Sequence, residues 1–198
     1  TADAFTGAML HVVVHAVVKC GLFLTAGVFV YYFDYTKVEQ LTGIGKRMPK
    51  TMWCYLLLSL ALVGIPPTGG FISKWYLAEG ALQSDTGVFA WLGPVVLLVS
   101  ALLTAGYLLP VAMKGFFPGV GAEPESRDEG DKGSDGLAAV PETETKTGAS
   151  STSEPDPIQE PALAMLLPLV LLAALAVLLG IFPGRLIEYA SRIATSVL

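Results

Sequence analysis

The sequence predicts an all-α, polytopic membrane helix bundle with four spans, one of them discontinuous, and a disordered acidic loop. The 198 residues are 53% hydrophobic with a mean hydropathy of +0.61, and only 15% are charged, against about 25% in ordinary soluble domains. Several stretches reach the roughly 20 apolar residues that cross a bilayer core. No basic segment precedes the first apolar run, so we interpret the chain as the C-terminal piece of something longer, without a signal peptide.

The first span covers residues 9–33, and the polar loop 34–50 follows it. This loop holds four cationic residues: Lys37, Lys46, Arg47 and Lys50. Short loops rich in Lys and Arg stay on the cytoplasmic side. With four spans, the later loop 117–161 is then also cytoplasmic and the C-terminus lies outside. We expect a multi-pass protein of the plasma membrane.

The second apolar region, 51–83, is too long for one upright span, because a helix of 33 residues would be about 50 Å long. Its middle reads Gly64-Ile-Pro-Pro-Thr-Gly-Gly70. Proline removes a helix hydrogen bond and glycine loosens the backbone, so half-helices are predicted at 51–64 and 69–83. The break is formed by Pro66, Pro67, Gly69 and Gly70. Membranes tolerate such backbone only beside protein or water, and transporters place ion sites there.

The third span covers residues 88–116, and Pro110 is expected to kink it. Residues 118–161 then hold eleven acidic residues against three basic ones, a net charge of −8. This stretch is rich in Gly, Ser, Thr and Pro and cannot bury enough apolar surface to fold. We predict a disordered acidic loop, with an acidic partner-binding segment as the alternative.

The last span covers residues 162–182, and a short helix lying at the membrane interface is predicted at 185–198. The chain thus divides into three parts. Membrane helices with the ion-path residues occupy 1–117, the acidic loop occupies 118–161, and the last span with its tail occupies 162–198.

Three ionisable residues, His11, His15 and Lys19, lie within the first span at positions i, i+4 and i+8. At this spacing they share one helix face. A lysine at the bilayer centre costs about 2.5–3.5 kcal/mol, so the face must meet protein or water. One such residue alone is well explained as structural glue between helices, whereas three in register favour a path for protons or cations.

Lys74 directly follows the predicted break, and its spacing leaves two interpretations open. It is either a lysine that reaches back to the interface from a helix end or a proton carrier, because removal from water disfavours its charged form. Histidine titrates near neutrality, so a chain of Lys and His joined by water can pass protons. Glu79 is expected nearer to the surface.

The sequence predicts no chemistry of its own beyond proton movement. Nucleophile, phosphate-loop and haem-ligand patterns are not found, and no cofactor, metal or nucleic-acid partner is expected. The histidine pair at i, i+4 has no carboxylate nearby to complete a metal site. Cys20 and Cys54 lie in apolar runs without a metal-binding spacing, and we interpret them as packed side chains.

Four stretches of the sequence carry a family resemblance: His11-Val-Val-Val-His15-Ala-Val-Val-Lys19, Gly43-Ile-Gly-Lys-Arg-Met-Pro49, Gly64-Ile-Pro-Pro-Thr-Gly-Gly-Phe-Ile-Ser-Lys-Trp75 and Leu179-Gly-Ile-Phe-Pro-Gly184. They resemble the antiporter-like subunits of respiratory complex I, Mrp-type multisubunit sodium/proton antiporters and membrane-bound hydrogenases. The acidic loop matches nothing in that family. Only the family's last four helices are covered, so the first of its two inverted repeats is absent.

The resemblance implies roles for individual residues. Lys19 corresponds to the family's intramembrane lysine, and His11 and His15 to its companion histidines. Lys74 corresponds to the lysine at the broken helix, near the proton exit toward the outside. The implied partners are other membrane subunits, including the missing N-terminal helices, with protons as the transported ion and sodium as an open question.

Within the family, the stretch around the break and Tyr107-Leu-Leu-Pro110 look most like the D-type subunit of Mrp antiporters. The alternative is a proton-pumping subunit of an NADH-quinone oxidoreductase (complex I) or of a membrane-bound hydrogenase, where electron transfer occurs in other subunits. An alternative of another class is a structural membrane anchor, which predicts that Lys19 and Lys74 are each paired and dry.

Overall fold

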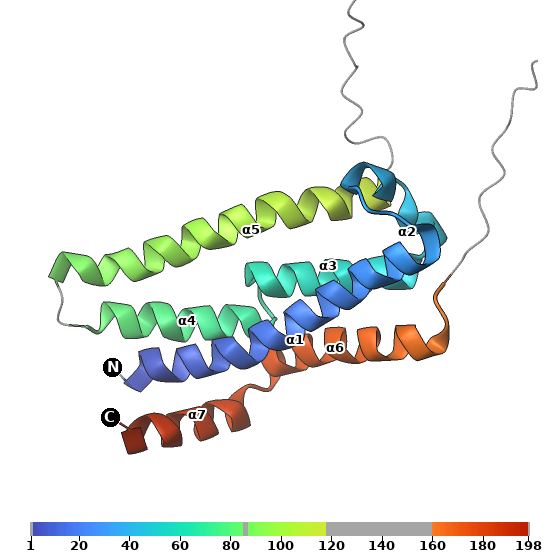
Figure 1. Cartoon of the computed structure of the whole chain (residues 1–198). Coiled ribbons are helices and arrows are strands. Elements are labelled where there is room, and N and C mark those ends of the chain that lie inside the picture. The colour runs from blue at the N-terminus through green and yellow to red at the C-terminus, as the bar shows by residue number, and fades with distance from the viewer. Residues whose placement is uncertain (1, 85–86, 118–159, 198) are drawn as a thin grey trace, which may run out of the picture.

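The computed structural model describes residues 2–84, 87–117 and 160–197, and these residues are helical or in connecting turns (Figure 1). The main helices are α1 (Ala2–Phe33), α3 (Pro49–Val63), α4 (Gly69–Leu82), α5 (Leu92–Phe116), α6 (Leu163–Ile181) and α7 (Gly184–Val197). Short elements connect them: η1 (Val38–Leu41), α2 (Ile44–Arg47) and η2 (Gly87–Trp91). The all-α prediction is confirmed. The acidic loop prediction lies, except for its last two residues, outside the described residues.

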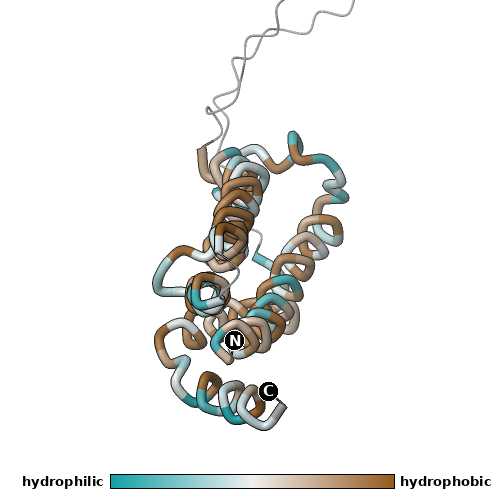
Figure 2. Tube along the Cα trace, turned by 90° about the vertical axis from the view of Figure 1, so that its left-hand side faces the viewer, coloured by the Kyte–Doolittle hydropathy of each residue, from teal (hydrophilic) through white to brown (hydrophobic). Residues whose placement is uncertain are grey.

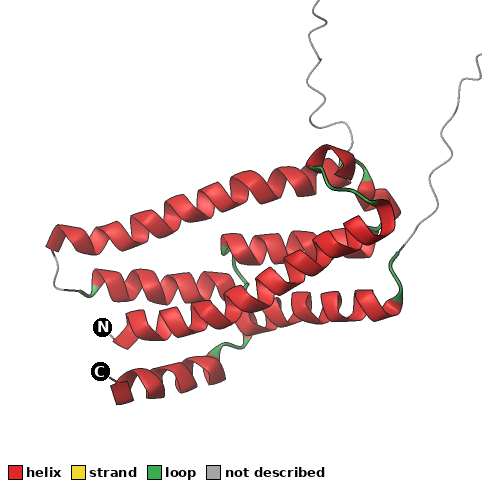
Figure 3. Ribbon diagram, in the orientation of Figure 1, coloured by secondary structure: helices red, strands yellow, loops and turns green. Residues whose placement is uncertain are grey.

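The helices share one long axis. Figure 1 shows α3 and α4 following one another end to end between α1 and α5, and Figure 2 shows the bundle from its end. α1 packs against α4, α6, α7 and α3, while α5 packs against α3 and α4. Figure 3 shows connecting segments at the two ends of the bundle and at the two interruptions, between α3 and α4 and between α6 and α7. The broken helix therefore lies inside the bundle.

Three segments are long and apolar enough to cross a membrane: Ala2–Phe33, Gly87–Phe116 and Leu163–Ile181. α3 is a shorter apolar helix, and α3 with α4 covers the same bundle length as α5 (Figure 1). The predicted arrangement of three complete spans and one discontinuous span is thus confirmed. α5 continues through Pro110, which lies inside the helix.

α1 begins at Ala2, earlier than the start near residue 9 that hydropathy indicates. The added turns are held by α4. A side chain on Gly7 would collide with the backbone of Leu77, so the two helices approach to backbone contact there. Small residues allow such approach between membrane helices, and the resulting packing extends α1 beyond its most apolar stretch.

The end of the bundle that carries the 34–48 segment is tied together by polar contacts. Gly43, with φ 78°, donates its backbone N–H to the Lys114 carbonyl at 2.9 Å. The Arg47 guanidinium lies 5.1 Å from the centroid of the Phe33 ring. Pro49 occupies the first turn of α3, where the missing N–H costs nothing. These contacts fix the start of the broken helix.

α7 confirms that the tail is helical. Its buried residues Ala190 and Ala194 point toward the bundle, and Leu186 and Ile193 line a shallow groove together with Met9 of α1. Arg192 and Glu188 form an exposed ion pair at 2.7 Å on the other face. That this helix lies at a membrane interface stays a prediction.

Candidate functional site

The helix of the second span is interrupted at residues 64–68, between α3 and α4; Pro66 and Pro67 lie in the interruption, whereas Gly69 and Gly70 form the first turn of α4. α3 ends at Gly64, whose φ of 91° is the left-handed conformation that glycine adopts readily. Its N–H and that of Ile65 both donate to the Leu60 carbonyl, at 3.0 and 3.1 Å. The Pro66–Pro67 peptide bond is cis, and α4 starts at Gly69. The chain therefore stops one helix and starts another within the bundle.

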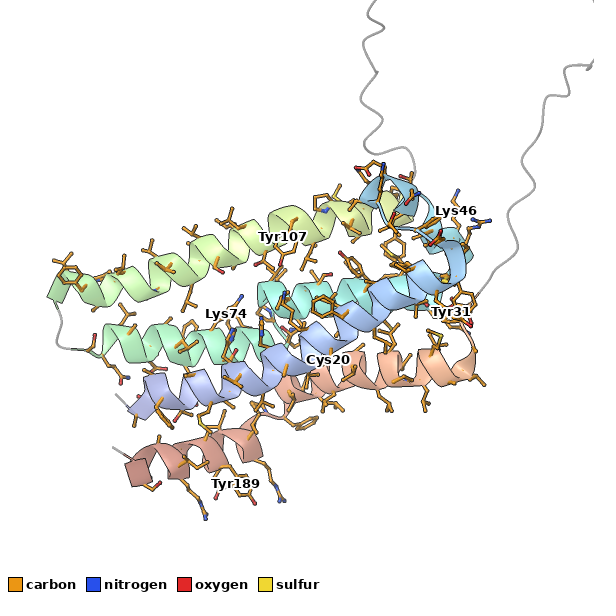
Figure 4. The ribbon with its side chains drawn as sticks, in the orientation of Figure 1. Cys20, Tyr31, Lys46, Lys74, Tyr107 and Tyr189 are labelled. Atoms are coloured by element: carbon orange, nitrogen blue, oxygen red, sulfur yellow. The ribbon has the colours of Figure 1, made fainter. Side chains whose placement is uncertain are left out.

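Lys74 binds the end of α3. Its Nζ donates to the carbonyls of Leu62 and Val63, at 2.9 and 2.7 Å. The last carbonyls of a helix have no partner inside the helix, and they form the negative end of its dipole. Figure 4 shows Lys74 at the junction of the two half-helices. The ammonium group therefore lies at the end of α3, and the depth of Lys74 in a membrane stays a prediction.

The position of Lys74 depends on close contact between α3 and α4. A methyl group on Gly70 would overlap the carbonyl oxygen of Ala61, so only glycine lets the first turn of α4 lie against the last turn of α3. A methyl group on Gly64 would lie 3.1 Å from Cδ of Lys74 and 3.4 Å from its Nζ. The two glycines therefore leave the space in which the ammonium group sits.

The two histidines lie next to one another on α1, with ring centroids 5.5 Å apart. Nδ1 of His11 is 3.0 Å from Oγ of Ser73, and this buried hydroxyl also donates to the Gly70 carbonyl at 3.1 Å. The structure thus brings His11 and His15 next to one another, with His11 against Ser73, the residue before Lys74, at the crossing of α1 and α4.

Lys19 lies one turn beyond His15 on α1. Its side chain is half-buried and makes no hydrogen bond or ion pair with the described part of the chain. The face of α1 with His11, His15 and Lys19 therefore runs from the break toward the other end of the bundle.

Lys74 also borders open space. A cleft of about 200 Å³ between α4 and α5 is lined by Lys74, Gly64, Trp75 and Ala78, among others. A second cleft of about 390 Å³ shares Trp75 and Ala78 with it and reaches Glu79 and Gln83. The two clefts follow one side of α4 from the break toward the bundle end where α4 stops. Lys74 and Glu79 thus border two adjacent clefts on the same side of α4.

Two residues make contacts that no pattern in the sequence predicts. Ser73 is one hydroxyl in an apolar helix, and only the crossing with α1 shows its contact with His11. Glu160, within the acidic stretch, accepts the backbone N–H of Lys50 at 2.7 Å and the Thr51 hydroxyl at 3.3 Å. It therefore caps the N-terminus of α3, where a negative charge is favourable.

These features define a polytopic membrane protein with a discontinuous helix and a lysine at the break. Residues 1–116 match the family model of the transmembrane part of NADH:quinone oxidoreductase and Mrp antiporter proteins. The chain belongs to this family. Relatives in the family are subunits of multisubunit membrane complexes.

Curated relatives come from both branches of the family. The chain is 42% identical to the N-type subunit of the NADH-quinone oxidoreductase of Desulforudis audaxviator over 126 residues, which cover 64% of this chain and 24% of the relative. It is 26% identical to the D-type subunit of the Na(+)/H(+) antiporter of Alkalihalophilus pseudofirmus over 195 residues, 98% of this chain and 32% of the relative. The chain thus spans about a quarter to a third of the length of these relatives.

A solved structure, the Mrp complex from Dietzia sp. DQ12-45-1b, has the same fold. One chain of that complex aligns with this chain with a TM-score of 0.71 and 24% sequence identity. The alignment covers 98% of this chain and 38% of the chain in the complex. The whole helix arrangement, including α6 and α7, therefore occurs in a solved membrane complex.

Proposed function

We propose that this chain is part of a proton-translocating subunit of a multisubunit Mrp-type cation/proton antiporter. The observation that carries the proposal is the Lys74 ammonium on the carbonyl end of a broken helix, one residue after Ser73, which contacts His11. Discontinuous helices in transporters hold their ions at such ends. A lysine in this position can hold a proton inside the membrane and release it.

In this proposal the proton path has three parts. Lys19, His15 and His11 form its first part along one face of α1. Lys74 holds the proton at the break, and the clefts along α4 lead from Lys74 to Glu79. Water has to join the parts, since no direct contact links Lys74 to a histidine in the described chain.

The Mrp assignment is supported by the share of this chain that each relative matches. The A1-type subunit of the Na(+)/H(+) antiporter of Staphylococcus aureus, like the D-type subunit, matches 98% of this chain, whereas the match to the N-type subunit covers 64%. The higher identity to the N-type subunit favours the alternative, a proton-pumping subunit of an NADH-quinone oxidoreductase. Neighbouring genes discriminate between them, because flavin and iron–sulfur subunits accompany the redox complex and small membrane subunits accompany the antiporter.

The proposal is tested by Lys74→Ala and Lys19→Ala in the full complex, reconstituted in vesicles with a pH-sensitive dye inside. A positioned proton carrier contributes about 10²–10⁴-fold to a proton-transfer rate, so each variant should lose most cation-linked proton movement. Lys37→Ala, in an exposed loop, is the matched control and should behave as wild type. Unchanged proton movement in the double variant would refute the proposal.

The structural-anchor alternative predicts a paired and dry lysine. Lys74 is indeed hydrogen-bonded, but it also lines an open cleft, and Lys19 makes no hydrogen bond in the described chain. Normal proton movement together with poor assembly of the Lys74→Ala complex would favour the anchor.

We also propose the plasma membrane as the location, with loops 34–50 and 117–161 cytoplasmic and the C-terminus outside. The cationic residues of the first loop support this orientation. Cysteine introduced at Lys37 should react with a membrane-impermeant reagent in inside-out vesicles and not in intact cells. The reverse pattern would contradict the orientation.

A further inference from the structure

Three hydroxyl groups lie in a row on the buried side of α3, a largely apolar helix. Thr51, Tyr55 and Ser59 stand at positions i, i+4 and i+8, so they occupy one face of the helix on successive turns. Thr51 and Ser59 are completely buried, and Tyr55 is almost so. The row begins in the first turn of α3 and ends one turn before the carbonyls that bind Lys74.

The first two hydroxyls of the row bind groups outside their own helix. Thr51 Oγ1 donates to Oε2 of Glu160 at 3.3 Å, and the Tyr55 hydroxyl donates to the Leu108 carbonyl of α5 at 3.2 Å. Glu160 is partly exposed, so its carboxyl group also reaches water at this end of the bundle. The row is therefore open to solvent where α3 begins.

Ser59, the innermost hydroxyl of the row, lacks a partner of standard geometry. Its Oγ is buried and makes no such hydrogen bond within the described part of the chain. The Tyr55 hydroxyl lies close to it but gives its proton to Leu108. A buried hydroxyl without a partner is costly, and alanine would fill the same position without that cost. Buried water is the usual partner for such a group.

We propose that Thr51, Tyr55 and Ser59, joined by buried water, form a further branch of the proton path, which links Lys74 with Glu160. This inference rests on the proposed function and supplies the direction that the clefts along α4 leave out. Those clefts lead from Lys74 toward the end of α4. The row leads the other way, to the end of the bundle where α3 starts (Figure 1).

A proton moves along this row without a net change in any hydroxyl group. The O–H bond of the Glu160 carboxyl group breaks, and each hydroxyl or water oxygen in turn gains one proton while its own O–H bond breaks and leaves the electron pair on oxygen. The last proton forms an N–H bond on Nζ of Lys74, once that group has released its proton toward the cleft. Water at the bundle end then returns a proton to the Glu160 carboxylate.

Ser59→Ala and Tyr55→Phe test the proposal in the full complex, reconstituted in vesicles with a pH-sensitive dye inside. Each should slow proton movement per assembled complex on the order of tenfold, less than the roughly 10²–10⁴-fold contribution of a positioned acid or base, because water still enters the row. Ser59→Ala should keep or gain thermal stability, since it removes an unpaired buried group.

Thr25→Val is the matched control. Thr25 is as buried as Ser59, but its hydroxyl donates to the Gly21 carbonyl of its own helix at 2.9 Å. It has no place in the row, so Thr25→Val should keep wild-type proton movement per assembled complex. An equal loss of proton movement in Thr25→Val and Ser59→Ala would overturn the proposal.

Two further outcomes would also overturn it. One is wild-type proton movement in the Ser59→Ala, Tyr55→Phe double variant. The other is a loss of thermal stability in Ser59→Ala that matches its loss of proton movement, since this assigns the hydroxyl to packing. The proposed function is tested separately by Lys74→Ala. Loss of proton movement there, with wild-type movement in the double variant, would leave the function standing and remove the hydroxyl row.

Discussion

Adding one methyl group at Gly70 should move the Lys74 ammonium away from the carbonyls at the end of α3. In Gly70→Ala the new methyl overlaps the Ala61 carbonyl oxygen, and relieving such an overlap requires α4 to move on the order of 1 Å. The Nζ to carbonyl distances of 2.9 and 2.7 Å would then approach or exceed the limit for a hydrogen bond. Overpacking of this kind typically destabilises by about 1–3 kcal/mol.

Gly106→Ala supplies the matched control. Gly106 lies in α5, and a methyl group there meets no described atom within 4 Å. Replacing glycine by alanine in a helix favours folding by about 0.5–1 kcal/mol, and both variants share this gain. Any difference between them therefore measures the contact of α4 with α3.

The assay compares both variants in the reconstituted complex by thermal unfolding and by proton movement. A displacement of about 1 Å can reduce a positioned reaction about 10²-fold, so Gly70→Ala should lose most proton movement and some thermal stability. Gly106→Ala should keep both. Equal proton movement in the two variants would refute the link between the break and the lysine, even if Gly70→Ala were less stable.

Three further variants test other contacts. Ser73→Ala removes the hydroxyl beside His11 and should slow proton movement several-fold, whereas the equally buried Thr25→Val should not. Glu160→Ala removes the cap of α3 and should lower the free energy of unfolding by about 0.5–2 kcal/mol, measured by thermal unfolding of the complex; no loss would show that water replaces the cap. Glu188→Gln breaks an exposed ion pair and should change stability by less than about 0.5 kcal/mol.

The sequence predicted the parts of the fold that depend on local chemistry. The break between α3 and α4 follows from two prolines and three glycines within seven residues, 64–70, because each weakens a helix by itself. The face with His11, His15 and Lys19 follows from helical spacing alone. Both features require no knowledge of a neighbouring helix.

The features that the sequence left undetermined depend on distant partners. The start of α1 at Ala2 reflects contact with α4. The role of Lys74 was undetermined because spacing gives its position along α4 and not the carbonyls that it reaches. Glu160 is 110 residues from Lys50 in the sequence. Nothing in the sequence sets it apart from the ten other acidic residues of 118–161.

The charge at the break also explains why a lysine, and not a carboxylate, occupies this position. The end of α3 is a negative pole, so a carboxylate reaching it from α4 would be repelled. For a lysine, burial costs about 2.5–3.5 kcal/mol, while the helix end returns about 0.3–2 kcal/mol and each charged hydrogen bond about 1.5–3 kcal/mol. Summed over the two hydrogen bonds of Lys74, these contributions match or exceed the cost of burial. The carbonyl end of α3 can therefore hold the lysine in its charged form inside the bundle, and a change that moves α4 away from α3 would remove most of this compensation.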